Sequence, residues 1–103
     1  MTDDVNGPPA AITMIPVLMY TTATCPYCIQ AERLLARKGV TNVEKVRVDL
    51  DPARRVEMME KTGLRSVPQI YIGELHVGGF EELAALEHAG ELAPLLAGQP
   101  LGQ

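Results

Sequence analysis

The feature that most restricts the fold of this chain is an alternation of short apolar runs with segments of helical periodicity. In chain order the pattern predicts strand 17–21, helix 26–38, strand 43–48, helix 51–62, strands 69–72 and 75–78, helix 80–89 and a short helix 92–97. A parallel strand–helix–strand unit followed by an antiparallel hairpin packs naturally as one mixed sheet. We therefore predict an α/β domain of the order β-α-β-α-β-β-α, with a four-stranded mixed sheet flanked by helices.

Local signals support these boundaries. Pro26 suits the first position of a helix, and Gly73 with Glu74 makes a two-residue loop of the II′ kind between the last two strands. Strand 43–48 alternates only partly, which favours an edge of the sheet. In helix 51–62 we expect Val56 and Met59 on the inner stripe.

Composition excludes several classes of protein. The chain has 103 residues, is 47% hydrophobic and 21% charged, and carries a net charge of −4 with scattered basic residues, which argues against nucleic-acid binding. No apolar run reaches the roughly 18–20 residues of a membrane helix. Residues 1–13 are predicted to be a disordered extension, 14–98 the folded domain and 99–103 a frayed tail. Residues 1–13 lack the basic region of a secretory signal, which favours the cytoplasm.

Cys25 and Cys28 are the only cysteines, and they open the first predicted helix. The unpaired N–H groups and positive dipole end of a helix stabilise a thiolate, the reactive form in disulfide exchange, at Cys25. Cys28, one turn further on, would lie near the buried face and attack a mixed disulfide on Cys25. A structural pair or half of a zinc site are the alternatives, although His76 and His88 lie at no ligand-like spacing and are expected at the surface. A redox pair is favoured.

Three blocks of sequence give the chain a close resemblance to the glutaredoxins, in particular to the bacterial dithiol class with a Cys-Pro-Tyr-Cys site. The blocks are Tyr-Thr-Thr-Ala-Thr-Cys-Pro-Tyr-Cys ending at Cys28, Ser-Val-Pro-Gln-Ile starting at Ser66, and Gly-Gly-Phe-Glu-Glu-Leu starting at Gly78. Thioredoxins proper carry Trp-Cys-Gly-Pro-Cys, whereas this chain has no tryptophan. The resemblance covers roughly Ile15 to Leu96 and implies a thioredoxin-like fold.

The resemblance also implies a glutathione site. Pro68 is expected in the cis form, which would leave the Val67 backbone free to pair with the cysteinyl part of glutathione. The helix that starts after Gly79 suits the γ-glutamyl carboxylate, and Glu81 would meet its amino group. The full expected set is Tyr27, Arg65, Ser66, Val67, Pro68, Gly79, Phe80 and Glu81. An ordinary proline at a strand start and acids that merely offset a helix dipole are the alternatives.

The sequence departs from the family pattern at two positions. Glu81 stands where aspartate is common, and Thr22 stands where many relatives have a lysine three residues before the first cysteine. The neutral Thr22 leaves more of the thiolate stabilisation to the helix terminus.

The function that the resemblance implies is a glutathione-dependent thiol–disulfide oxidoreductase, a glutaredoxin of electron transport and cell redox homeostasis. Cys25 would reduce glutathione mixed disulfides, and the pair of cysteines would reduce protein disulfides such as that of a ribonucleotide reductase. We expect glutathione as co-substrate, no metal, no membrane or nucleic-acid partner, and a cytoplasmic monomer. Two alternatives stay open: a glutathione-ligated [2Fe–2S] cluster carrier, which Pro26 disfavours, and a reductant of one partner recharged by thioredoxin reductase.

Overall fold

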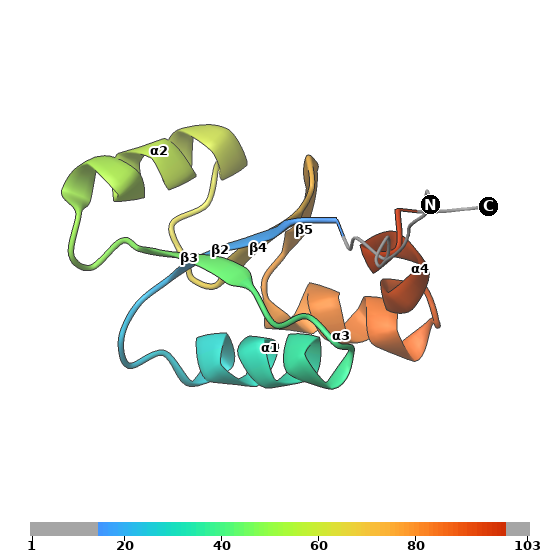
Figure 1. Ribbon diagram of the computed structural model, residues 1–103. Helices are drawn as coiled ribbons and strands as arrows, with labels where there is room; N and C mark the ends of the chain where they lie inside the picture. Colours follow the sequence, from blue (N-terminus) through green and yellow to red (C-terminus); the bar gives the residue numbers. More distant parts are fainter. Residues whose placement is uncertain (1–14, 99–103) are drawn as a thin grey trace, which may run out of the picture.

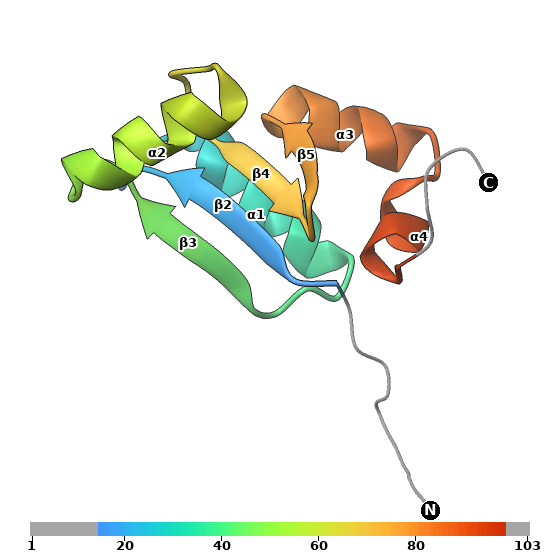
Figure 2. The same ribbon diagram turned by 90° about the horizontal axis from the view of Figure 1, so that it is seen from above.

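A four-stranded mixed sheet organises residues 15–98, which are the residues that the computed structural model describes. Its strands are β2 (Val17–Thr21), β3 (Val43–Arg47), β4 (Gln69–Ile72) and β5 (Leu75–Gly78). They lie in the order β3-β2-β4-β5, with β2 parallel to β3 and β4 antiparallel to both β2 and β5 (Figure 2). The predicted fold class and the edge position of β3 are confirmed. The predictions for 1–13 and 99–103 lie outside the described residues.

Helices cover both faces of this sheet. They are α1 (Pro26–Arg37), α2 (Pro52–Thr62), α3 (Phe80–His88) and α4 (Leu92–Leu96), each within one residue of its predicted ends. α2 lies over one face, and α1 and α3 lie over the other, with α4 beyond the end of α3 (Figure 1). None of the described helices, of which α1 is the longest at twelve residues, is long and apolar enough to cross a membrane.

Residues that the sequence predicts at helix starts and turns occupy those positions in the structure. Pro26 occupies the first turn of α1, and the carboxylate of Asp51 caps α2 by accepting from Ala53 N at 3.1 Å. Gly73 turns the β4–β5 hairpin with a φ of +60°, a conformation that costs glycine nothing.

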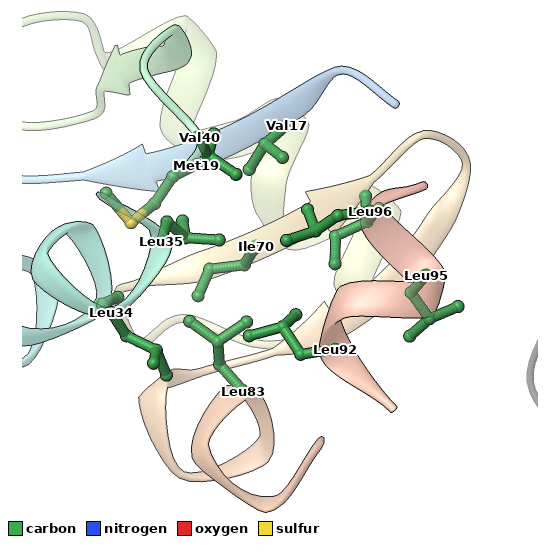
Figure 3. Packing of buried hydrophobic residues seen from close by; sticks show 12 residues of the cluster. Val17, Met19, Leu34, Leu35, Val40, Ile70, Leu83, Leu92, Leu95 and Leu96 are labelled. Carbon is green, nitrogen blue, oxygen red and sulfur yellow. The ribbon is translucent and has the colours of Figure 1, made fainter. Parts of the chain in front are cut away.

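Two unequal cores lie on the two sides of the sheet. Below it, α1, α3 and α4 bury a cluster of twelve residues: Val17, Met19, Ala31, Leu34, Leu35, Val40, Ile70, Ile72, Leu83, Leu92, Leu95 and Leu96. Figure 3 shows leucines of the three helices converging on Ile70 of β4. The buried residues under α2 are four: Tyr20, Val46, Val48 and Met58.

One prediction about the α2 core is wrong. Val56, expected to point inward, is 48% exposed, and Met58 is the fully buried residue of α2. Two residues along a helix correspond to a rotation of about 200°, so burial of Met58 turns Val56 to the opposite side. Met59, one step from Met58, is half-buried as predicted.

Candidate active site

The two cysteines occupy different environments at the start of α1. Cys25 is the N-cap residue, and its sulfur accepts from the backbone N–H of Cys28 at 3.3 Å. Cys25 is partly exposed, whereas Cys28 is 1% exposed. The predicted N-cap position of Cys25 and the burial of Cys28 are therefore confirmed. One sulfur can meet a substrate, and the other can be reached only from within the protein.

Burial also sets the protonation of the inner cysteine. Desolvation raises the pKa of Cys28 to about 11, while a hydrogen bond with Thr21 acts in the opposite direction. Cys28 is thus a neutral thiol at physiological pH. The thiolate is the nucleophile in disulfide exchange, so a buried neutral thiol is poorly suited to open the reaction.

The loop after α2 brings the second sequence block against Cys25. The Val67–Pro68 peptide bond is cis, as predicted. The carbonyl oxygen of Val67 lies 3.7 Å from Cys25 Sγ. The partly exposed sulfur of Cys25 therefore faces the backbone of this loop.

A groove of about 520 Å³, a size that suits a small-molecule ligand, lies along the Val67–Pro68 turn, and Tyr27 between the two cysteines is part of its lining. Seven of the eight predicted glutathione-binding residues line it: Tyr27, Ser66, Val67, Pro68, Gly79, Phe80 and Glu81. Arg65 does not line it. Arg65 is exposed, and its backbone carbonyl, not its guanidinium group, accepts a hydrogen bond from Arg55 at 3.4 Å.

At the N-terminus of α3 the structure refines the prediction. The N–H of Gly79 donates to Glu82 Oε1 at 2.8 Å, so a carboxylate of the protein already occupies this donor. First-turn N–H groups have no partner inside a helix, which leaves those of Phe80 and Glu81 for an anion. Glutamate three residues after the cap is the capping-box signal that could have identified Glu82 from sequence.

Gly78 keeps the backbone close to this carboxylate. Its φ is +115°, and a Cβ atom there would come within 3.0 Å of Glu82 Oε1. A side chain at this position would therefore be strained and would push against Glu82.

Sequence reasoning missed two further groups of residues. Gln69 and His76 line the groove, although the sequence analysis placed His76 at the surface. Asp49 accepts from the N–H of Ala23 at 3.4 Å, in the loop before Cys25, and Arg47 binds its two carboxylate oxygens at 2.7 Å. The Arg47 hydrogen bonds lower the pKa of Asp49 to about 2, so the carboxylate is charged beside the loop that carries Thr22.

The strand–helix placement of the dithiol and the mixed sheet define a thioredoxin-like dithiol protein. Comparison with known proteins assigns the chain to one family within this class. The family model "Glutaredoxin" matches residues 17–77. A glutaredoxin of Pseudomonas aeruginosa is 54% identical over 82% of this chain and 99% of its own length. Glutaredoxin 3 of Escherichia coli is 45% identical over 81% of this chain and 99% of its own length. The chain belongs to the glutaredoxin family, whose members are thiol oxidoreductases.

Solved structures agree with this assignment. The solution structure of a glutaredoxin from Brucella melitensis superposes with a TM-score of 0.72 at 42% identity, covering 86% of this chain and 97% of that one. A crystal structure of a buckwheat glutaredoxin–glutathione complex gives a TM-score of 0.72 at 26% identity, covering 79% and 76%.

Proposed function

We propose that this protein is a glutathione-dependent thiol–disulfide oxidoreductase that acts on glutathione mixed disulfides and protein disulfides. The observation that carries the proposal is the approach of Cys25 Sγ to the carbonyl of Val67, 3.7 Å away, at a groove lined by the Val67–Pro68 turn and the start of α3. The buckwheat protein, whose structure holds glutathione, supports this choice of ligand.

With a glutathione mixed disulfide, the Cys25 thiolate attacks the glutathionyl sulfur. A Cys25–glutathione disulfide forms, and the substrate leaves as a thiolate that takes a proton from water. The Val67 backbone pairs with the cysteinyl part of glutathione, while the N–H groups of Phe80 and Glu81 receive the γ-glutamyl carboxylate. The thiolate of a second glutathione then attacks the bound glutathionyl sulfur, releasing glutathione disulfide and the Cys25 thiolate.

With a protein disulfide, both cysteines take part. Cys25 attacks one substrate sulfur, and the other substrate sulfur leaves as a thiolate that takes the proton of Cys28. The Cys28 thiolate then attacks the Cys25 sulfur of the mixed disulfide, and the second substrate sulfur leaves as a thiolate that takes a proton from water. The products are a substrate dithiol and a Cys25–Cys28 disulfide, which two glutathione molecules reduce again. Ribonucleotide reductase is one proposed substrate. We propose that the protein works as a cytoplasmic monomer.

A coupled assay tests this function. The protein is mixed with a glutathionylated peptide and recharged either by glutathione with glutathione reductase or by thioredoxin reductase, each with NADPH. We expect turnover with the glutathione system alone. Turnover only with thioredoxin reductase would instead assign the protein as a reductant outside the glutathione system. An absorbance band of a [2Fe–2S] cluster after anaerobic purification, without turnover, would indicate a cluster carrier.

A further inference from the structure

Gln69 is a buried polar side chain at the groove that neither the dithiol chemistry nor the predicted ligand contacts use. It is 2% exposed and follows Pro68 directly. Its Nε2 donates to the carbonyl oxygen of Ser66 at 3.0 Å and lies 3.4 Å from the Ser66 hydroxyl. Its Oε1 lies 2.7 Å from Nε2 of His76. The amide of Gln69 therefore joins the two strands of the hairpin to the turn before Pro68.

The direction of these hydrogen bonds follows from the chemistry of their ends. The Ser66 carbonyl can only accept, so the NH₂ group of Gln69 must face it. The amide oxygen of Gln69 then faces His76 and can also only accept. His76 must therefore carry a proton on Nε2 and donate. The chain of donation runs from His76 through Gln69 to the Ser66 carbonyl.

His76 itself is held from outside the groove. Its ring stacks on Tyr71 with centroids 5.0 Å apart and an angle of 28° between the planes. Lys61 Nζ lies 4.9 Å from the centroid of the Tyr71 ring. The register of β4 and β5 shifts between the pairs Ile70–Gly78 and Tyr71–His76, so one extra residue lies in β5 directly after His76. Such a bulge redirects the neighbouring side chain.

We propose that His76 and Gln69 are positioning residues for glutathione, and this inference rests on the proposed function. They hold the Ser66 carbonyl and thereby the turn into Val67, the residue whose carbonyl faces Cys25 Sγ. If the His76 donor is lost, the buried amide oxygen of Gln69 loses this hydrogen bond, and only the Ser66 contacts hold the Gln69 side chain. The turn is then anchored less firmly, and the backbone that pairs with glutathione is less well fixed.

The first test needs no activity. ¹⁵N NMR of the imidazole nitrogens, at a pH where His76 is neutral, reports which nitrogen carries the proton. We expect the proton of His76 on Nε2. A proton on Nδ1 would overturn the proposed direction of the chain. His88 is exposed at the end of α3 and provides the reference spectrum of a histidine in solvent.

The second test measures specificity. His76→Phe keeps a ring to stack on Tyr71 but removes the donor, Gln69→Met keeps the length of the side chain without its polar atoms, and His76→Gln restores an N–H near the position of Nε2. Each variant is assayed for kcat/KM with one peptide carrying either a glutathione or a cysteine mixed disulfide. We expect the preference for the glutathione form to fall about 3- to 10-fold in His76→Phe and Gln69→Met, the value of one hydrogen bond. His76→Gln and the control His88→Phe should stay within about 2-fold of the parent.

The outcomes separate this inference from the proposed function. A parent protein without preference for the glutathione form overturns both. A parent preference that persists in His76→Phe overturns only the positioning role. Should Gln69→Met fail to fold, the pair His76→Phe and His76→Gln decides, because His76 is only half-buried.

Discussion

The two faces of the sheet are held to their helices in different ways. Beneath it, twelve buried and almost wholly aliphatic residues fix α1, α3 and α4. Under α2 only four residues are buried, and polar contacts supplement them. The Tyr20 hydroxyl donates to Glu57, which also accepts from Arg54 at 3.1 Å. Lys61 Nζ lies 5.9 Å from the ring centroid of Tyr20 and 4.9 Å from that of Tyr71.

The two faces therefore position different parts of the candidate site. The aliphatic face fixes α1 with its two cysteines and α3 with its first-turn N–H groups. The α2 face leads into the turn at Ser66 and Val67 and includes the His76–Tyr71 stack. Under the proposed function, the first face positions the two cysteines and the carboxylate-binding end of α3, and the second positions the turn whose backbone pairs with the cysteinyl part of glutathione. The following changes test that division, from the largest expected effect to the smallest.

Loss of the reactive sulfur should have the largest effect. We expect Cys25→Ser to abolish reduction of every disulfide, because no other exposed thiol exists in the chain. Cys28→Ser should keep reduction of glutathione mixed disulfides and lose reduction of intramolecular protein disulfides. Assays with a glutathionylated peptide and a disulfide-containing protein measure both. Equal losses in the two variants on the glutathionylated peptide would contradict the division of roles.

The aliphatic core should dominate stability. Leu35 is fully buried, and Leu35→Ala should lower the free energy of unfolding by about 2–5 kcal/mol. Val56→Ala, on the exposed side of α2, is the control and should change it by about 0.5 kcal/mol or less. Urea denaturation followed by circular dichroism measures both. A small loss in Leu35→Ala would show that the larger cluster does not carry the fold.

Alkaline pH should weaken the reduced protein through Cys28. The pKa of Cys28 rises on folding from an ordinary value of 9.0 to about 11, so over that interval the unfolded chain has lost a proton that the folded protein keeps. The stabilising contribution of the protonated thiol is complete below pH 9 and is lost as the pH rises through 11. Denaturation curves from pH 8 to about 11 should show this loss in the parent and a smaller one in Cys28→Ser. An equal loss of stability with pH in the parent and in Cys28→Ser would show that the buried Cys28 thiol is not the cause of the loss.

The polar contacts under α2 should contribute less than the aliphatic core. Tyr20→Phe removes the hydroxyl that binds Glu57, and the half-exposed Glu57 can bind water instead, so we expect a loss of about 0.5–1.5 kcal/mol. Burial and the Glu57 hydrogen bond also raise the pKa of Tyr20 above its ordinary value of 10.0, so its contribution is lost from about pH 10 upward, which overlaps the upper half of the Cys28 interval. Cys28→Ser should therefore remove the loss that begins near pH 9, and Tyr20→Phe should reduce the loss only above about pH 10. A loss in Tyr20→Phe equal to that in Leu35→Ala would remove the distinction between the faces.

The helices, strands and dithiol could be predicted because their signals are local. Pro26, Asp51 and Gly73 mark ends within a few residues, and the cysteine spacing needs only one turn of helix. The inward side of α2 was mispredicted because the exposed Val56 is as apolar as the buried Met58. The link from His76 to Gln69 depends on a bulge in β5, and that of Asp49 to Ala23 joins residues 26 apart in the chain. No local pattern shows either contact.

The smallest expected effect concerns the charge in the loop before Cys25, which leads into α1. Thr22→Lys should speed alkylation of Cys25 by iodoacetamide at pH 7, and Thr22→Glu should slow it, because a nearby charge changes the thiolate fraction. A half-exposed charge acts through a high dielectric, and Arg47 already neutralises the ionised Asp49 beside this loop. Each substitution should therefore change the free energy of forming the Cys25 thiolate by about 1 kcal/mol or less. This change should shrink as salt rises, since the Debye length is about 8 Å at physiological ionic strength. Asp49→Asn, which leaves Arg47 unpaired, should act in the same direction as Thr22→Lys. Identical alkylation rates in all four proteins at low salt would show that charge in this loop does not reach the sulfur.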